Sequence, residues 1–377
     1  MVLLVTSAFD GGNAQVCDAA DPENVRLRIA PDVGEEHYQW FSYRVSNAAR
    51  RPLVMHLENA GGASYPKGWE GYRACASYDL ERWFRVPTDY ADGVLTIRHQ
   101  PEADSVCYAY FAPYSLERHR GLVARAARRP RTVGEVLGHT LDGRDLDLLR
   151  VGEEGAGKRR CWIIARQHPG ETMAEWLMEG LLGRLQDPAD PVARVLLDRA
   201  VFYLVPNMNP DGSFRGHLRT NAAGTNLNRA WAQPSLEASP EVYLVRARME
   251  ETGVDFCLDV HGDEALPYNF IAGSDGVEGL RPGLAEARHA YERALVTASP
   301  DFQTTHGYPK AAPGKANMTM ATNQVAHRFQ ALAMTLEQPF KDNADGPDPI
   351  EGWSPARCQL LGRANLDALH AVVEQLG

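Results

Sequence analysis

The chain has 377 residues and a formal net charge of −10 at pH 7, with 44% hydrophobic and 23% charged side chains. This is the composition of an ordinary globular protein, long enough for two domains. The acidic balance argues against nonspecific binding of nucleic acid or of anionic membranes. The sequence contains no apolar run of the length that a transmembrane helix needs.

The start of the chain and its cysteines bear on the cellular compartment. Residues 1–13 lack the basic start and the small-residue cleavage pattern of a signal peptide, so they predict a first strand. The six cysteines are scattered, and Cys107, Cys161 and Cys257 lie in apolar, strand-like runs that predict reduced, buried thiols. We therefore expect a cytoplasmic location.

Residues 1–115 predict a small antiparallel β-sandwich domain. Short segments rich in Val, Ile and aromatic residues alternate with Gly, Asn, Asp and Pro, and none has the length and period of a helix. Aromatic residues such as Trp40, Phe41, Trp69 and Phe84 could form a ligand platform. A role in the sandwich core is the better interpretation, because large aromatic rings dominate protein cores.

Residues 116–377 predict a second domain of the α/β class. A basic helical stretch from about 114 to 131 is interpreted as a solvated connector rather than a DNA-binding helix, and 133–152 as a hairpin that turns at Asp142-Gly143. Four apolar strands then alternate with helices. The strands are expected at 161–165, 200–205, 255–260 and 331–336, and the helices near 171–186, 238–252, 284–298 and 362–376. This order predicts a mixed, largely parallel sheet covered by helices.

Polar residues follow the carboxyl ends of these strands. His168 and Glu171 lie in the Pro-Gly turn after the first strand, His261 ends the third and Glu337 ends the fourth. The Asn207–Gly212 loop follows the second. Because the carboxyl ends of parallel strands meet at one edge of a sheet, we expect these residues to converge although they are far apart in sequence.

The residue types suggest a metal-assisted hydrolase. Two imidazoles and one carboxylate leave a coordination position of zinc open, which is the catalytic arrangement. Glu337 would be a carboxylate placed to take a proton from water. The segment 215–231, which has no apolar periodicity, supplies arginines and amides for binding a substrate.

Six short motifs together resemble the zinc carboxypeptidases of the carboxypeptidase A superfamily. They are HPGE, NPDG, the arginine of LRT, NLNRAW, the histidine of DVHGDE and the glutamate of MTLEQPF. The bacterial type of the cytosolic carboxypeptidase branch is the most similar, because in that branch a β-sandwich domain with motifs like YQWFSYRV and VCYAYFAPYS precedes the peptidase domain. The resemblance spans nearly the whole chain and implies a carboxypeptidase-like α/β domain at 116–377.

The resemblance also implies roles for individual residues. One zinc ion per chain would be bound by His168, Glu171 and His261. Glu337 would be the general base that later passes the proton to the leaving amine, and Arg219 would polarise the scissile carbonyl and hold the oxyanion.

Asn228 and Arg229 would bind the free C-terminal carboxylate, for which a planar guanidinium is suited. This contact makes such an enzyme an exopeptidase, acting on the C-terminal tail of a peptide or protein.

Three features depart from the family pattern. Asn226 stands where the family often has an aspartate that orients a zinc histidine, and an uncharged acceptor should raise ligand basicity less. Between 314 and 327 the only basic residue is Lys315, whereas the eukaryotic branch has an arginine for acidic terminal residues; this leaves polyglutamate trimming in doubt. The mobile tyrosine of the superfamily could be Tyr268, Tyr291 or Tyr308, of which Tyr308 in a Gly-Pro-rich loop fits best.

The sequence therefore predicts a cytoplasmic zinc metallocarboxypeptidase. One alternative is a zinc amidohydrolase of an N-acyl amino acid, which would also present a free carboxylate to Asn228-Arg229. The other is a binding module with a vestigial zinc site, although a vestigial site has no chemical need for Glu337. The preferred terminal residue, the oligomeric state and the role of the sandwich domain are left open by the sequence.

Overall fold

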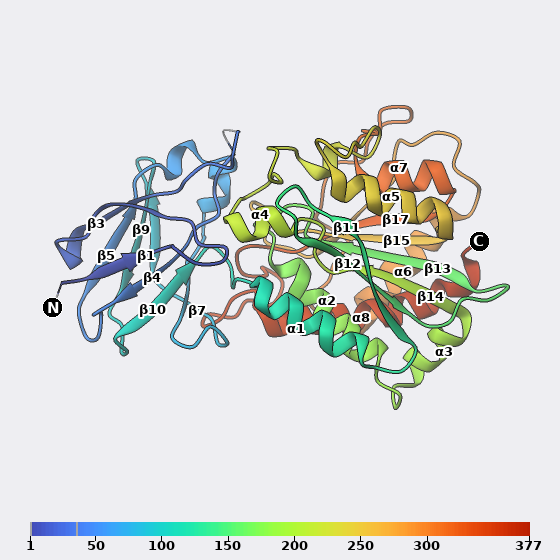
Figure 1. The fold of residues 1–377 in the computed structure, drawn as a ribbon, viewed down its shortest axis with the longest axis horizontal. Helices are drawn as coiled ribbons and strands as arrows, with labels where there is room; N and C mark the ends of the chain where they lie inside the picture. The colour runs from blue at the N-terminus through green and yellow to red at the C-terminus, as the bar shows by residue number, and fades with distance from the viewer. Residues whose placement is uncertain (1, 35–36) are drawn as a thin grey trace.

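The computed structural model describes residues 2–34 and 37–377. It consists of an N-terminal β-sandwich and a larger C-terminal α/β domain that lie side by side (Figure 1). None of the helices in these residues is long and apolar enough to cross a membrane.

Within the described residues, the N-terminal strands form two five-stranded sheets, in the orders β1-β4-β10-β6-β7 and β2-β3-β5-β9-β8. The strands are β1 (Leu4–Thr6), β2 (Gln15–Asp18), β3 (Val25–Arg28), β4 (Ser42–Ser46), β5 (Leu53–Leu57), β6 (Cys75–Ser77), β7 (Phe84–Arg85), β8 (Thr88–Ala91), β9 (Val94–His99) and β10 (Ser105–Ala109). Their pairings are antiparallel apart from the parallel β3–β5 pair. The predicted sandwich is confirmed.

The aromatic residues of the sandwich form its core, as predicted. Trp40, Phe41 and Trp69 are at most 2% exposed, and Phe84 is half-buried. The Trp69 and Tyr110 rings meet edge to face with centroids 5.2 Å apart, and the indole N–H of Trp69 donates to the carbonyl of Ala60. A platform made of these rings would have to be exposed, so the alternative interpretation was wrong.

The C-terminal domain contains a seven-stranded mixed sheet, among the residues described, in the order β11-β12-β14-β13-β15-β17-β16. The strands are β11 (Thr132–His139), β12 (Asp145–Val151), β13 (Arg159–Ala165), β14 (Ala200–Val205), β15 (Phe256–Val260), β16 (Phe270–Gly273) and β17 (Leu332–Glu337). The four central strands β14, β13, β15 and β17 are parallel, and the outer pairs β11–β12, β12–β14 and β16–β17 are antiparallel. The four predicted core strands and the hairpin are confirmed.

Helices cover both faces of this sheet (Figure 1). They are α1 (Leu116–Ala127), α2 (Met173–Leu185), α3 (Pro191–Arg199), α4 (Pro210–Arg215), α5 (Pro240–Thr252), α6 (Leu284–Ala298), α7 (Ala321–Phe329) and α8 (Pro355–Val372). Side chains of β13 alternate between the two faces, as in any strand. Cys161 and Ile163 pack in the core of α2, α6 and α8, whereas Trp162 and Ile164 pack in the core of α5 and α7.

Two helix predictions need correction. The connector interpretation of α1 was wrong, because Leu116, His119, Leu122 and Ala126 are buried and pack α1 against the domain. The last helix begins at Pro355, earlier than predicted, because Pro at the first helical position and Ser354 before it favour a start there. Helices α3 and α7, only nine residues each, were not predicted.

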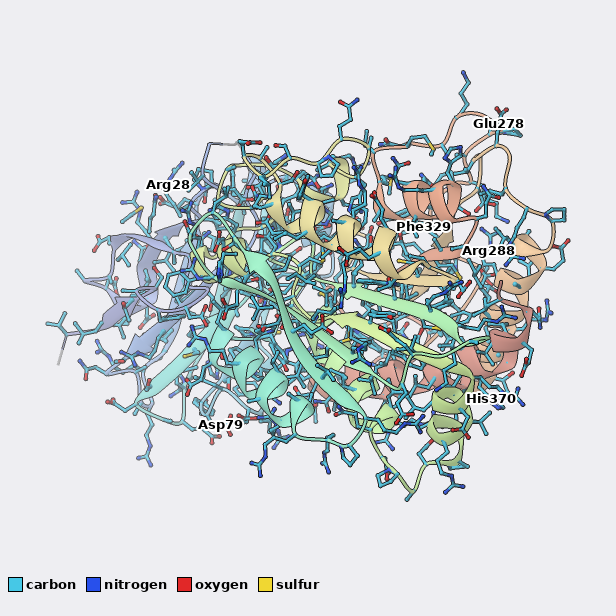
Figure 2. The ribbon with its side chains drawn as sticks, turned by 45° about the vertical axis from the view of Figure 1, so that its right-hand side comes forward. Arg28, Asp79, Glu278, Arg288, Phe329 and His370 are labelled. Carbon is cyan, nitrogen blue, oxygen red and sulfur yellow. The ribbon has the colours of Figure 1, made fainter. Side chains whose placement is uncertain are left out.

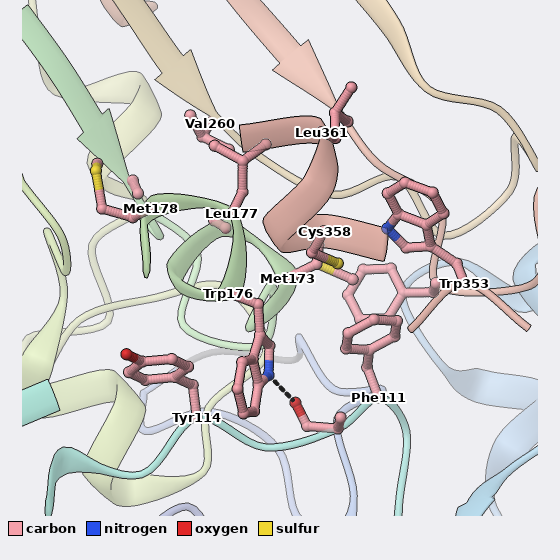
Figure 3. Close-up of a cluster of buried hydrophobic side chains, with 14 of the residues drawn as sticks. Phe111, Tyr114, Met173, Trp176, Leu177, Met178, Val260, Trp353, Cys358 and Leu361 are labelled. Atoms are coloured by element: carbon pink, nitrogen blue, oxygen red, sulfur yellow. Dashed lines mark hydrogen bonds between the residues drawn. The ribbon is translucent and has the colours of Figure 1, made fainter. Parts of the chain in front are cut away.

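Helix α2 begins directly after the turn that carries His168 and Glu171, and it packs closely against α8. A methyl group added to Gly180 would overlap the backbone oxygen of Gln359, and one added to Gly362 would overlap that of Leu177. The two backbones therefore touch with no side chain between them. Figure 3 shows the large residues around this contact, including Trp176, whose indole donates to the carbonyl of Ala112.

This contact predicts opposite effects for two glycines of α2. Gly180→Ala should lower the free energy of unfolding by at least about 2 kcal/mol, because the added methyl meets backbone. Gly183→Ala should raise it by about 0.5–1 kcal/mol, because Gly183 is exposed, open space surrounds it and alanine favours the helix. Urea denaturation followed by circular dichroism measures both. Equal midpoints for the two variants would contradict the packing.

A buried polar network supports the same turn. Arg166, 3% exposed, has a left-handed backbone (φ 60°) and donates to the carbonyl of Pro169 at 2.8 Å and to Glu175 at 2.5 Å. The second oxygen of Glu175 meets His119 Nδ1 at 2.8 Å, and His119 Nε2 meets Asp147 at 3.1 Å. Burial alone lowers the pKa of His119, but the two carboxylates outweigh it and raise the pKa to about 9.

This raised pKa predicts how stability changes with pH. The unfolded pKa of histidine is about 6.5, so the stabilisation by charged His119 is fully present below about pH 6.5 and is lost as pH rises through about 9. The free energy of unfolding of the wild type relative to His119→Gln should fall by about 2–3 kcal/mol over that range. Exposed His370→Gln is the control (Figure 2). Parallel pH curves for wild type and His119→Gln would contradict the charged network.

Candidate functional site

The candidate site lies at the carboxyl ends of the parallel strands. His168 and Glu171 occupy the turn between β13 and α2, His261 follows β15 directly, and Glu337 is the last residue of β17. Because β15 pairs with both β13 and β17, these residues are neighbours across the sheet. The convergence predicted from the strand ends is present in the structure.

Three buried side chains form a set of metal-ligand atoms. Ligand atoms of His168, Glu171 and His261 all lie within 4.8 Å of one another. One Glu171 oxygen is 2.7 Å from Nδ1 of His168, and the other is 2.7 Å from Nδ1 of His261. Two nitrogens and a carboxylate around one point are the donor set of a catalytic zinc site.

Outer hydrogen bonds orient both imidazoles so that Nδ1 faces inward. Nε2 of His168 lies 3.0 Å from the Asn226 side-chain oxygen, and Nε2 of His261 lies 2.9 Å from Asp259. Carbonyl and carboxylate oxygens at these distances fix the N–H on Nε2 and leave the Nδ1 lone pair for a metal, so the residues fit zinc. Asp259 was missed at the sequence level, although a carboxylate inside the apolar strand DFCLDV was a visible signal.

The charges around the two histidines differ. Burial lowers the pKa of His168 to about 4, with Arg219 adding to the effect against the attraction of Glu171. Burial also disfavours the charged form of His261, but Asp259 and Glu171 outweigh it and hold the pKa of His261 well above its usual value. His261 therefore has two carboxylate neighbours, Glu171 and Asp259. His168 has only Glu171, because its second partner is the neutral amide of Asn226.

Glu337 lies beside the donor set but is not part of it. Its side chain is 7% exposed, and its Oε2 has no hydrogen-bond partner among residues 2–34 and 37–377. Burial raises the pKa of Glu337 to about 8; His261 opposes the shift, and the carboxylates of Glu171 and Asp263 add to it. An unpartnered buried carboxylate oxygen is costly, and functional sites are where such costs are found.

Two arginines bring positive charge to the site. Arg219 places its Cζ 5.7 Å from the centre of the Tyr65 ring. Burial and the nearby Arg219 both lower the pKa of Arg229 below its ordinary value, and Arg229 donates to the carbonyl of Asn228. Within the described part of the chain, neither guanidinium forms a salt bridge with a carboxylate.

Asn228 is 4% exposed and lies between His261 and the start of α7. Its side-chain oxygen accepts from the backbone of Ala321 at 2.9 Å, and its Nδ2 is 3.4 Å from His261 Nε2. The side-chain oxygen of Asn228 is thus already used by Ala321, whereas its amide nitrogen can donate a hydrogen bond to a substrate.

The three candidate tyrosines have different surroundings. Tyr291 is in the core with its hydroxyl on Asn365, and Tyr268 stacks on His306. Tyr308 is 46% exposed and donates to Asp263, two residues after His261, at 2.6 Å. It lines a cavity of about 480 Å³ together with Lys315 and Arg288; the latter is paired with Asp275.

Residues 207–212, which form a short loop and the first turn of α4, support the residue before His168. Asn209 accepts from the Gly212 backbone at the start of α4, and its Nδ2 donates to the carbonyl of Gln167. Gln167 in turn donates to Asp259 at 2.7 Å and accepts from the Trp231 indole. The NPDG motif thus fixes the residue before His168.

Comparisons with known proteins agree with this geometry. The family model described as the cytosolic carboxypeptidase N-terminal domain matches residues 5–111, and that described as zinc carboxypeptidase matches residues 120–262. A metallo-carboxypeptidase from Pseudomonas aeruginosa, solved in complex with (2-guanidinoethylmercapto)succinic acid, is 48% identical, with a TM-score of 0.96 over 99% of each chain.

Two further relatives differ in length. An uncharacterised protein of Zymomonas mobilis subsp. mobilis is 50% identical over 100% of this chain and 98% of its own. Mouse cytosolic carboxypeptidase 6 is 26% identical over 72% of this chain, but the match covers 55% of the mouse protein. The chain thus matches the Zymomonas relative over its full length, and it spans about half the length of the mouse relative.

The two matched models and the full-length bacterial metallocarboxypeptidase structure place the chain in the zinc carboxypeptidase family, and it is a peptidase with the N-terminal domain of the cytosolic carboxypeptidases.

Proposed function

We propose that this protein is a zinc-dependent metallocarboxypeptidase that removes C-terminal residues from peptides or protein tails. The observation that carries the proposal is the buried Oε2 of Glu337, which lies beside the donor set of His168, Glu171 and His261 and has no hydrogen-bond partner within the described part of the chain. A general base needs a free carboxylate oxygen within reach of water, and it must stay outside the ligand set.

In this proposal one zinc ion is held by Nδ1 of His168, Nδ1 of His261 and the Glu171 carboxylate. When bound, zinc supplies a Lewis acid that lowers the pKa of water and draws electrons from a carbonyl oxygen. Asn226 and Asp259 keep the two imidazoles oriented through Nε2.

The remaining groups act on protons and charge. Glu337 takes a proton from the attacking water and returns it to the leaving amine; burial and neighbouring carboxylates raise its pKa, which makes the carboxylate a stronger base and favours the first of these transfers. Arg219 places positive charge where the carbonyl oxygen becomes negative. Such charge, held in place before the reaction, lowers the barrier most when no protein carboxylate neutralises it.

The free carboxylate of the substrate is bound by Arg229 and by the amide nitrogen of Asn228. The absence of a salt bridge to Arg229 within the described residues leaves its guanidinium available for a bidentate contact. The ligand of the Pseudomonas relative is a succinic acid, so that relative accepts a carboxylate compound. Tyr308, whose hydroxyl donates to Asp263 close to His261, is the tyrosine that would contact the substrate.

We also propose a division into a β-sandwich domain at 1–115 and a catalytic domain at 116–377, located in the cytoplasm. The names of the relatives and six free cysteines support the location. The intact set of ligands, base and arginines disfavours a vestigial site. An N-acyl amino acid would fit the same carboxylate contact, but no contact in the site favours it over a peptide.

The role of Glu337 predicts a separation of activity from metal binding. Glu337→Gln keeps the size of the side chain but cannot take a proton, so kcat should fall by at least about 10²-fold. Zinc measured by inductively coupled plasma mass spectrometry should stay at one ion per chain, because Glu337 is outside the donor set.

Glu241→Gln is the matched control, because Glu241 is also a buried glutamate whose pKa burial raises, in its case to about 7, but it lies in α5 and is hydrogen-bonded to Asn221. It should retain wild-type kcat. Loss of zinc from Glu337→Gln, or full activity in that variant, would contradict the assignment.

A further inference from the structure

A carboxylate of the N-terminal sandwich holds the backbone of the Arg219 segment. Asp32, 2% exposed, accepts from three consecutive backbone N–H groups: Leu218 at 2.7 Å, Arg219 at 2.8 Å and Thr220 at 2.8 Å. The Thr220 hydroxyl donates to it at 3.0 Å. A buried carboxylate requires such donors, and together they fix the segment in one conformation.

The same segment contacts the metal-binding turn on its other side. The carbonyl of Leu218 accepts from the backbone N–H of Gly170 at 3.0 Å, and Gly170 lies between His168 and Glu171. A methyl group on Gly170 would come within 3.0 Å of that carbonyl oxygen. A continuous chain of hydrogen bonds thus runs from Asp32 through 218–220 to the turn that carries two candidate zinc ligands.

The neighbouring contacts of the sandwich reinforce this arrangement. The backbone N–H of Val33 donates to Nε2 of buried His217 at 3.3 Å, which places the proton of the neutral ring on Nδ1, facing the carbonyl of Thr220. Residues 32–33 therefore contact both ends of the segment 217–220.

The sandwich also covers the side chain of Arg219. The Tyr65 ring lies 5.7 Å from the Arg219 Cζ. Buried Gln39 fixes the backbone of Tyr65: the Gln39 side chain accepts from the Tyr65 N–H at 2.8 Å and donates to the Tyr65 carbonyl at 3.1 Å. A ring face this close attracts a guanidinium and restricts where it can point.

We propose that the N-terminal sandwich positions Arg219 for catalysis, through Asp32 on its backbone and Tyr65 on its guanidinium. Asp32 and Tyr65 are positioning residues. The inference rests on the proposed role of Arg219 at the developing oxyanion. It gives the sandwich a direct part in the chemistry, because displacement of a charge by about 1 Å can cost about 10²-fold in rate.

The test is a double-mutant cycle on full-length, zinc-loaded protein. The substrate is chosen from a library of peptides with different C-terminal residues, as the peptide that the wild type trims fastest. Asp32→Asn replaces one acceptor oxygen by a donor amide that faces backbone N–H groups. It should lower kcat about 10- to 100-fold with little change in KM or zinc content, since the lost interaction belongs to the transition state. In an Arg219→Ala background the same change should have no further effect on kcat.

Hydrogen exchange gives a readout that is independent of activity. Amides 218–220 should exchange faster in Asp32→Asn than in the wild type, and those of the distant β9 should not. Ile97→Ala is the control for lost stability, because Ile97 is fully buried in β9. It should lower the melting temperature and leave kcat unchanged.

The outcomes separate the inference from the proposed function. Full activity of Arg219→Ala would contradict the role of Arg219 itself. An inactive Arg219→Ala with a fully active Asp32→Asn would overturn the inference alone, as would equal losses from Asp32→Asn in both backgrounds.

If Asp32→Asn does not fold, Tyr65 provides the test. Tyr65→Ala should lower kcat only when Arg219 is present, and Tyr65→Phe, which keeps the ring, should restore it. Equal effects of Tyr65→Ala with and without Arg219 would also overturn the inference.

Discussion

The Glu171 carboxylate, buried between the imidazoles of His168 and His261, is the interaction on which the rest of the site depends. It joins the end of β13 to the end of β15, and two adjacent parallel strands bring its partners within reach. Burial makes such a set unfavourable unless every group has a partner or a metal. Asn226 is the hydrogen-bond partner of Nε2 of His168, and Asp259 is the partner of Nε2 of His261.

Much of the surrounding fold serves to hold that carboxylate in place. Helix α2 begins two residues after Glu171, and the glycine contact with α8 leaves the helix no room to shift. Arg166, paired with Glu175, donates to the turn at Pro169, and Leu218 of the segment 218–220 accepts from the turn at Gly170. That segment is in turn held by Asp32, so the site draws its geometry from both domains. A catalytic domain separated from its sandwich would lose these contacts with Arg219.

The sequence was sufficient for the features that follow a local period or a motif. Strand ends placed His168, Glu171, His261 and Glu337 together, because apolar strands and polar ends are local signals. The buried face of α1 was missed because arginines dominate its composition, although Leu116, His119, Leu122 and Ala126 follow a helical spacing. Asp32 could not be predicted, since a single aspartate in a loop gives no sign of partners 186 residues away. Tyr65 has no motif either, and only the packing of the two domains brings it to Arg219.

The central claim is that this site removes residues from free C-termini with the help of zinc. Mass spectrometry of a mixed peptide library, incubated with zinc-loaded protein and with a chelated control, tests it most directly. The account predicts stepwise loss of C-terminal residues that stops with the chelator and does not occur on C-terminally amidated peptides, which lack the carboxylate that Arg229 would bind. Peptides left intact by protein with one zinc per chain, or amidated peptides trimmed as fast as free ones, would contradict it.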